Sequence, residues 1–67
     1  MSEVVRDPDV LGGLPVFKGT RVPVKNLFDM LESGESLSDF LEDFPTVSAV
    51  QARSVLRESE QMVEAAA

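Results

Sequence analysis

The sequence predicts a small, mainly helical domain in which three short helices pack as a helix-turn-helix, preceded by a short β hairpin or β arm. Apolar residues recur at helical spacing in three successive segments, and each segment is bounded by residues that start or stop helices. The connections between these segments are short, so the helices must pack against one another. The segment before them is instead rich in proline, glycine and β-branched residues, which is typical of turns and short strands.

The chain of 67 residues is long enough for one domain with a small core. Such a core seldom supplies more than about 3–5 kcal/mol of stability, so these domains usually rely on a disulfide, a metal or a partner. Cysteine and histidine are both absent, which excludes disulfides and removes the commonest metal ligands. We therefore expect self-association or docking on a partner, and neither a metal nor another cofactor.

Residues 1–14 are expected to form an extended N-terminal arm. Asp7-Pro8-Asp9 and Gly12-Gly13 favour turns, and a proline keeps the residue before it extended. The start of the chain lacks the pattern of a signal peptide, and no apolar stretch approaches the ~20 residues of a membrane span. A cytoplasmic protein without membrane contact is the resulting expectation.

Residues 15–24 predict a β hairpin or two short extended pieces. Apolar and β-branched residues lie on both sides of Lys18-Gly19-Thr20, where Gly19 can adopt a positive φ. An isolated hairpin is marginally stable in water, so we expect the hairpins of two chains to meet in a homodimer, with Phe17 as a candidate anchor. The residues expected to contact a second copy or a partner are Val16, Phe17, Val22, Val24, Glu58 and Met62.

Two helices are predicted to follow the β element. Pro23 suits a first helical turn, and Gly34 suits the position that ends the first helix. Ser36 can cap the second helix, and Pro45 stops it. The inward faces are formed by Val24, Leu27, Phe28 and Leu31 in the first helix and by Leu37, Phe40, Leu41 and Phe44 in the second.

The third helix is predicted to begin near Ser48, because Ser48 and Gln51 fit a capping box. Its inward stripe consists of Ala52, Val55 and Leu56, extended by Ser59 and Met62. The β element and the three helices together are expected to occupy residues 15–59. Residues 60–67 are expected to form a C-terminal tail of the kind that can fold on binding.

The net charge of −6 is unevenly distributed. Between Leu14 and Phe28 there are three bases and no acid, whereas from Asp29 onward nine acids accompany only Arg53 and Arg57. An acidic chain is a poor ligand for nucleic acid, but a local basic patch is compatible with such binding. The acidic half suits a basic protein partner better.

Six residues are candidates for contact with DNA: Lys18, Arg21, Lys25, Gln51, Arg53 and Arg57. The first three could contact phosphates, or they could keep the edge of the hairpin soluble. The last three lie in the third helix, where arginine can pair with guanine and glutamine with adenine. The alternative is that the two arginines pair with Glu58, Glu60 or neighbouring acids.

Catalysis is not expected from this composition. The chain has no histidine or cysteine, no phosphate-binding loop and no nucleophile elbow. The adjacent acids Glu42 and Asp43 would point about 100° apart on a helix, so they cannot act on one substrate together. The acids are therefore interpreted as a solvated surface.

The order of these motifs resembles that of the bacterial family of domains of unknown function numbered 433 (DUF433). The residues that carry the resemblance are Asp7-Pro8, Gly13-Leu14-Pro15-Val16-Phe17-Lys18-Gly19-Thr20-Arg21-Val22-Pro23-Val24, Leu31-Glu32-Ser33-Gly34, Phe44-Pro45 and Val47-Ser48. They cover roughly Val4 to Ser59, and the stretch from Pro15 to Val24 is the most specific. The resemblance implies a homeodomain-like three-helix fold preceded by a small β element.

The resemblance also implies a function. Members are similar to antitoxins of the VapB kind, so the chain would bind and silence a PIN-type ribonuclease toxin and would repress its own operon by binding DNA as a dimer. Residues 18–21 correspond to the signature loop of the family, and no catalytic residue carries over. Ala49-Val50 opens the third helix where relatives tend to be polar, which favours a protein contact.

Three functions stay open at this point. The first is an antitoxin-like binding protein whose acidic C-terminal part masks a nuclease. The second is a stand-alone helix-turn-helix transcriptional regulator without a toxin partner, and the third is a structural dimerisation module. Salt dependence separates the first two, because binding through several phosphates weakens steeply with salt.

Overall fold

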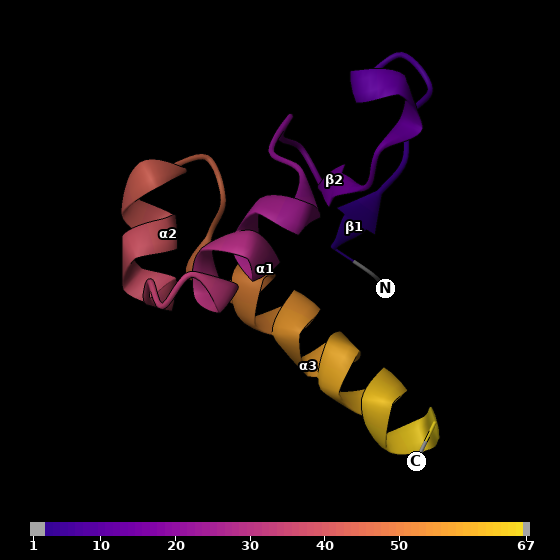
Figure 1. The fold of residues 1–67 in the computed structure, drawn as a ribbon. Coiled ribbons are helices and arrows are strands. Elements are labelled where there is room, and N and C mark those ends of the chain that lie inside the picture. Colours follow the sequence, from indigo (N-terminus) through magenta and orange to yellow (C-terminus); the bar gives the residue numbers. More distant parts are fainter. Residues whose placement is uncertain (1–2, 67) are drawn as a thin grey trace.

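The computed structural model describes residues 3–66, which form three helices and a small β element at one end of the molecule (Figure 1). The elements in chain order are β1 (Val4–Val5), the 3-10 turn η1 (Leu11–Gly13), β2 (Val16–Phe17), α1 (Val24–Glu32), α2 (Leu37–Asp43) and α3 (Ala49–Ala66). The predicted mainly helical class, with three helices and a short antiparallel β element, is confirmed.

β1 is a strand that the sequence did not predict. It pairs antiparallel with β2, with Val4 opposite Phe17 and Val5 opposite Val16. The backbone N–H of Lys18 extends this pairing by donating to the carbonyl of Glu3 at 2.8 Å. The expected extended arm therefore supplies a strand partner for the β element.

The predicted hairpin lies on the other edge of β2. Val16 forms an isolated antiparallel bridge with Pro23, and the N–H of Phe17 donates to the carbonyl of Val22 at 3.0 Å. Because successive residues of a strand direct their hydrogen bonds to opposite edges, β2 lies between β1 and the segment around Val22. The arrangement buries β2 within its own chain.

The end of α1 is fixed by Gly34, as predicted. Gly34 has a φ of 90°, its N–H donates to the carbonyl of Leu31, and the N–H of Glu35 donates to the carbonyl of Met30. These two bonds are those of the Schellman motif, in which a glycine in the left-handed conformation follows the last residues of a helix. The tight turn brings α2 directly back against α1.

A capping box starts α2 at Ser36, as predicted. The side chain of Ser36 accepts a hydrogen bond from the N–H of Asp39, and the carboxylate of Asp39 accepts one from the N–H of Ser36 at 2.9 Å. The backbone N–H and then the side chain of Ser36 lower the pKa of Asp39 below that of an ordinary aspartate. The ionised carboxylate therefore stabilises the start of α2.

Replacing Asp39 with asparagine is expected to lower the melting temperature most at neutral pH. Since the folded-state pKa of Asp39 is lowered, its contribution is fully present above about pH 3.9 and is lost as the pH falls through that lower pKa. The difference in melting temperature between wild type and Asp39→Asn should therefore shrink between pH 6 and pH 2. A difference that stays constant over that range would contradict this role of the carboxylate.

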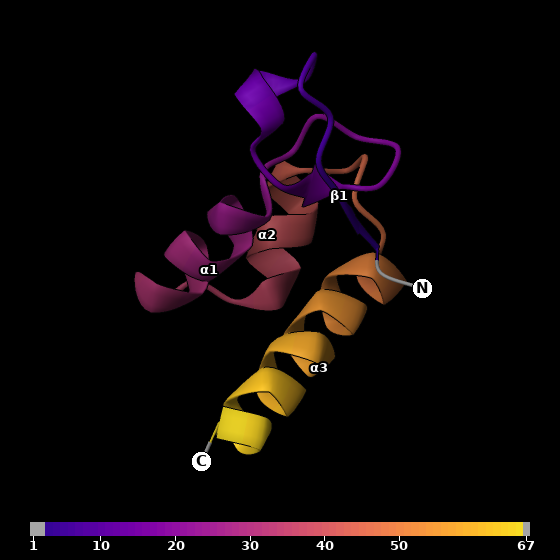
Figure 2. The ribbon, with the colours of Figure 1, turned by 90° about the vertical axis from the view of Figure 1, so that its right-hand side faces the viewer.

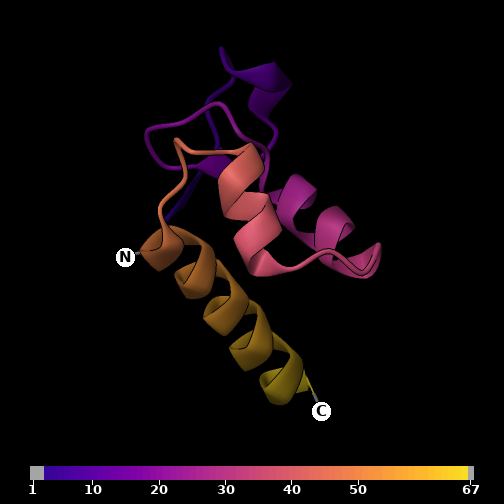
Figure 3. The same cartoon turned by 90° about the vertical axis from the view of Figure 1, so that its left-hand side faces the viewer.

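α3 begins with the predicted capping box and continues past the expected boundary at residue 59. The N–H of Gln51 donates to Oγ of Ser48, and Oε1 of Gln51 accepts from the N–H of Ser48, both at 3.1 Å. The helix then runs to Ala66, through residues 60–66 that were assigned to a tail. Figures 2 and 3 both show this second half of α3 projecting away from the rest of the molecule.

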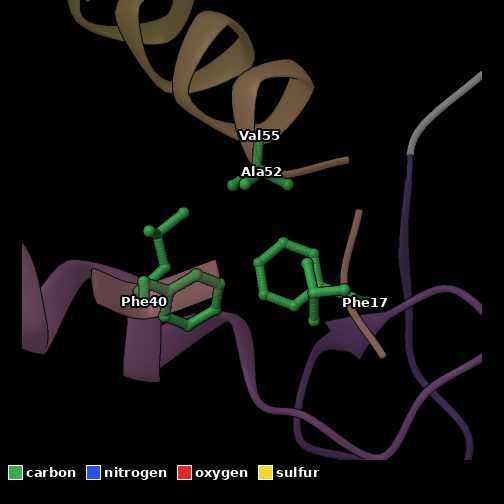
Figure 4. Packing of buried hydrophobic residues seen from close by; sticks show 6 residues of the cluster. Phe17, Phe40, Ala52 and Val55 are labelled. Atoms are coloured by element: carbon green, nitrogen blue, oxygen red, sulfur yellow. The ribbon is translucent and has the colours of Figure 1, made fainter. Parts of the chain in front are cut away.

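The core lies where the β element, α1, α2 and the first half of α3 meet. Its buried residues are Val16, Phe17, Leu27, Phe40, Val47, Ala52 and Val55. The ring of Phe17 packs against Phe40 with centroids 5.8 Å apart, and Ala52 and Val55 point toward these rings from α3 (Figure 4). Phe44 extends the aromatic cluster, with its ring 5.0 Å from that of Phe40.

Two expectations about the apolar residues are corrected by this core. Val16 and Phe17 are 1% and 0% exposed, so their side chains are not available to a second chain. They are buried because β1 and the helices cover β2 within one molecule. Phe28, expected on the inward face of α1, is 37% exposed because Leu27 occupies the central position of that face.

Candidate functional site

Within residues 3–66, the buried residues of α3 all lie in its first half. Ala52 and Val55 are buried, whereas Met62 and Val63 are 73% and 69% exposed. Residues 60–66 are all exposed, whereas Glu58 and Ser59 just before them are half-buried. Met62 was expected to extend the inward stripe of the third helix, but its exposed side chain does not pack inward. The same exposure leaves Met62 accessible to a partner, as was also expected.

The turn at residues 18–21 holds the N-terminal end of α3. Nε2 of Gln51 donates to the carbonyl of Lys18 at 2.8 Å, while the N–H of Lys18 donates to Glu3. The side-chain amide of Gln51 therefore takes part both in the capping box and in the hydrogen bond that joins α3 to the turn at residues 18–21. Its two polar atoms are occupied, which argues against the expected pairing of Gln51 with adenine.

Thr20 and Gly19 fix the shape of the same turn. Oγ1 of Thr20 donates to the carbonyl of Phe17 at 2.8 Å and accepts from the N–H of Val22 at 3.0 Å. Gly19 has a φ of 77°, which confirms the positive φ that the sequence predicted. The segment that carries the family resemblance is therefore a rigid support for α3, with Lys18 and Arg21 exposed at its surface.

Two substitutions of Gln51 separate its two roles. Gln51→Glu keeps an acceptor for the N–H of Ser48 but has no donor for the carbonyl of Lys18, whereas Gln51→Ala loses both bonds. A typical hydrogen bond contributes about 0.5–1.5 kcal/mol. We expect Gln51→Glu to lose about that much in urea unfolding and Gln51→Ala to lose more. A glutamate variant as stable as wild type would show that the link to Lys18 contributes nothing.

The outward face of the first half of α3 carries two arginines. A shallow hollow on this face is lined by Val50, Arg53, Ser54 and Arg57, which are spaced i, i+3, i+4 and i+7. Among residues 3–66, neither Arg53 nor Arg57 forms an ion pair with a carboxylate. The expected alternative, in which neighbouring acids pair with these arginines, is therefore not what the structure shows for Arg53 and Arg57.

The structure does not gather the predicted basic residues into one patch. Gln51, which holds the turn of Lys18, points about 200° around α3 from Arg53, so the turn and the arginines lie on different sides of the helix. Lys25 lies on α1, where its ammonium forms an ion pair with Asp29 at 2.6 Å. The hydrogen bond to Asp29 raises the pKa of Lys25, so its ammonium keeps its charge. The adjacent carboxylate offsets that charge and makes Lys25 a weaker ligand for a phosphate.

Val50 and Ser54 belong to the same face as the arginines but were not among the predicted site residues. Their spacing relative to Arg53 and Arg57 follows directly from the helical repeat, which is the signal that could have identified them. Val50 is 74% exposed, so an apolar side chain here meets solvent rather than the core. The face therefore combines two cations, a hydroxyl and an apolar group.

The described part of the chain holds no group of acids placed to bind a metal ion. None of the helices within residues 3–66 is both long and apolar enough to cross a bilayer. The remaining candidate surfaces are thus the two faces of α3, one in each half of the helix.

Comparison with known proteins places this chain in a family. A family profile described as a protein of unknown function (DUF433) matches residues 4–57. The chain belongs to the DUF433 family. The matched region of this DUF433 protein runs from β1 to Arg57, so residues 58–66, with Met62 and Val63, lie beyond it.

A relative of this DUF433 protein is described only as uncharacterized protein y4eO from Sinorhizobium fredii (strain NBRC 101917 / NGR234). It is 42% identical over 50 residues, which are 75% of this chain and 23% of the relative. The chain therefore spans about a quarter of the length of the relative that it matches. No solved structure matches the chain.

Proposed function

We propose that this DUF433 protein is a cytoplasmic, non-enzymatic antitoxin-like binding protein that neutralises a PIN-type ribonuclease toxin. The observation that carries the proposal is the second half of α3, where Met62 and Val63 are exposed on a helix that projects from the body. An apolar surface that a small monomer keeps exposed is typical of a protein-binding site. The proposal assigns the toxin contact to this half of α3.

Charge supports a nucleic-acid-binding enzyme as the partner. Nine of the twelve acids follow Phe28, and residues 58–66 contain Glu58, Glu60 and Glu64 without a base. A surface that binds RNA is basic, so it attracts an acidic helix and is covered by it. Because α3 is already helical, binding does not require the ordering of this segment, which lowers the entropic cost of association.

Inhibition of RNA cleavage tests this function. The PIN-type ribonuclease encoded nearest to the gene of this protein would be purified and titrated with the full chain, with fluorescent single-stranded RNA as substrate. We expect cleavage to fall to background near a stoichiometric ratio. Full cleavage in the presence of excess chain would contradict the antitoxin proposal.

A second candidate function is a stand-alone DNA-binding regulator, and the outward face of α3 favours it. The spacing of Val50, Arg53, Ser54 and Arg57 matches the way in which the third helix of a homeodomain presents side chains to the major groove. The helices α2 and α3 are joined by residues 44–48 only, as in a helix-turn-helix. The homeodomain-like fold and operon repression by a dimer belong to this candidate.

Salt dependence distinguishes this second candidate. Binding to DNA from upstream of the gene should weaken linearly in log salt, with a slope that decreases by about 2 in Arg53→Ala/Arg57→Ala if both arginines contact phosphates. Binding to a toxin through apolar anchors responds less to salt.

The expected homodimer stays a prediction. Val16 and Phe17 are covered, so a contact between the hairpins of two chains would have to use Val22 and Val24, which are half-buried.

A further inference from the structure

We infer that one charged face of α3 associates with the same face of a second copy of the chain, with the two helices antiparallel. The surface, called here the charged stripe, consists of Arg53, Arg57, Glu60 and Glu64. The inference goes beyond the proposed function, because it concerns a contact between copies of this chain and involves neither a toxin nor DNA. It assigns the expected homodimer to a surface other than the hairpin.

The four side chains of the charged stripe share a narrow part of the helix surface. They are spaced i, i+4, i+7 and i+11, which at 100° per residue places them within about 60° of one another. All four residues are exposed, and within residues 3–66 none of their side chains takes part in an ion pair. Arg57 and Glu60 are near enough along α3 to pair, but such pairs within one helix are weak, and this one is not formed among the described residues. One line along α3 therefore begins with two cations and ends with two anions.

This order of charges is complementary to itself when the helix is reversed. Arg53 and Glu64 lie equally far from the point between residues 58 and 59, and so do Arg57 and Glu60. A two-fold axis through that point therefore places each arginine opposite a glutamate of the partner and forms four ion pairs. Packed helices lie about 8–10 Å apart, a distance that an arginine and a glutamate side chain bridge together. A parallel pair would bring like charges together, so the charges specify the antiparallel arrangement.

The fold leaves room for this arrangement. The charged stripe points about 140° around α3 from the midpoint of the buried residues Ala52 and Val55. In Figures 2 and 3, no other described element lies along the side of α3 that faces away from α1 and α2. The bodies of two antiparallel copies then lie at opposite ends of the helix pair and do not collide. The shallow hollow between Arg53 and Arg57 is in the position that the partner's glutamates reach.

DNA fits the complete stripe less well than a second copy does. The two arginines could contact phosphates, but Glu60 and Glu64 continue the same line and would repel the backbone. The net charge of −6 on each copy opposes self-association. At physiological salt this repulsion is screened beyond about 8 Å, whereas groups in contact still attract each other. The alternation of charge within the stripe therefore favours a second copy.

Two charge-reversal variants test the inference by sedimentation equilibrium. Arg53→Glu/Arg57→Glu makes the stripe wholly acidic, and Glu60→Arg/Glu64→Arg makes it wholly basic. We expect wild type to dimerise with a Kd on the order of 100 µM, because the contact is small and polar. Each variant alone should dimerise at least about tenfold more weakly, since attraction becomes repulsion. An equimolar mixture of the two variants should form a heterodimer at least as readily as wild type dimerises, because all four ion pairs return.

The matched control is Arg6→Glu/Arg21→Glu, which changes the net charge as much as the acidic variant does but lies outside α3. We expect this control to dimerise like wild type and not to form a heterodimer with the basic variant. Circular dichroism of each variant checks that α3 stays helical.

Three results would overturn the inference. Wild type that stays monomeric at tenfold above the expected Kd would show that the stripe does not hold a second copy, and binding of that monomer to upstream DNA would assign the arginines to DNA. Wild-type dimerisation by both reversal variants would place the contact elsewhere, as in a hairpin dimer. A heterodimer of the control with the basic variant, equal to that of the acidic variant, would mean that net charge alone drives association.

Discussion

Replacing Phe17 with alanine is expected to unfold most of the protein at 25 °C. The side chain is 0% exposed and packs against Phe40 at the junction of the β element and α2. Truncation of a buried phenylalanine costs about 3–5 kcal/mol, which equals the whole stability expected of so small a core. Circular dichroism should show loss of helix and no cooperative thermal transition.

Phe28→Ala is the matched control for this substitution. Its ring is 37% exposed at the margin of α1, so truncation removes much less buried surface. We expect Phe28→Ala to melt cooperatively, with a reduced melting temperature. A folded, monomeric Phe17→Ala protein with the wild-type melting temperature would contradict the core shown here and would restore Phe17 as an intermolecular anchor.

Gly19→Val is expected to produce the second-largest loss of stability. Gly19 has a φ of 77°, and a Cβ at this position would meet no atom within 4 Å. The cost therefore comes from the backbone, where a left-handed conformation of a β-branched residue costs about 1–3 kcal/mol. Urea unfolding should show the midpoint shifted to lower urea with an unchanged slope.

Gly19→Asn serves as the control, because asparagine adopts positive φ more readily than other residues with a Cβ. We expect it to lose less stability than the valine variant. Equal losses in the two variants would mean that the side chain, rather than the backbone conformation, disturbs the turn. Unchanged stability of Gly19→Val would contradict the positive φ itself.

The helices could be predicted because their signals are local. The apolar spacing of Leu37, Phe40 and Leu41 and the caps at Ser36 and Ser48 depend only on residues within a few positions of each other. Gly34 likewise ends α1 through its own backbone conformation. Such features are encoded in short segments, and the structure shows them at the expected residues.

The parts that were missed depend on contacts between distant residues. β1 has two residues, which is too short for an alternating pattern, and it exists because β2 offers a free edge 12 positions later. The link from Gln51 to Lys18 joins residues 33 positions apart. The exposure of Phe28 also depends on packing, since its position on the apolar side of α1 does not reveal where the neighbouring helix ends.

The candidate site was predicted in part. Met62 was expected to contact a partner, and Arg53 and Arg57 were expected on an outward face of the third helix. The sequence could not show that α3 extends beyond the packed part of the molecule. The length of a helix after its last packed turn depends on weak helix propensities rather than on an apolar pattern. The separation of the two faces of α3 therefore became visible only in the structure.

Affinity capture from the native host with three full-length baits tests whether the second half of α3 binds a ribonuclease partner. The baits are wild type, Val50→Gln and Met62→Gln/Val63→Gln, and the captured proteins are identified by mass spectrometry at moderate salt. We expect a basic ribonuclease with wild type and with Val50→Gln, and its loss with Met62→Gln/Val63→Gln. Capture of that ribonuclease in equal amounts by all three baits would contradict a partner site on the second half of α3.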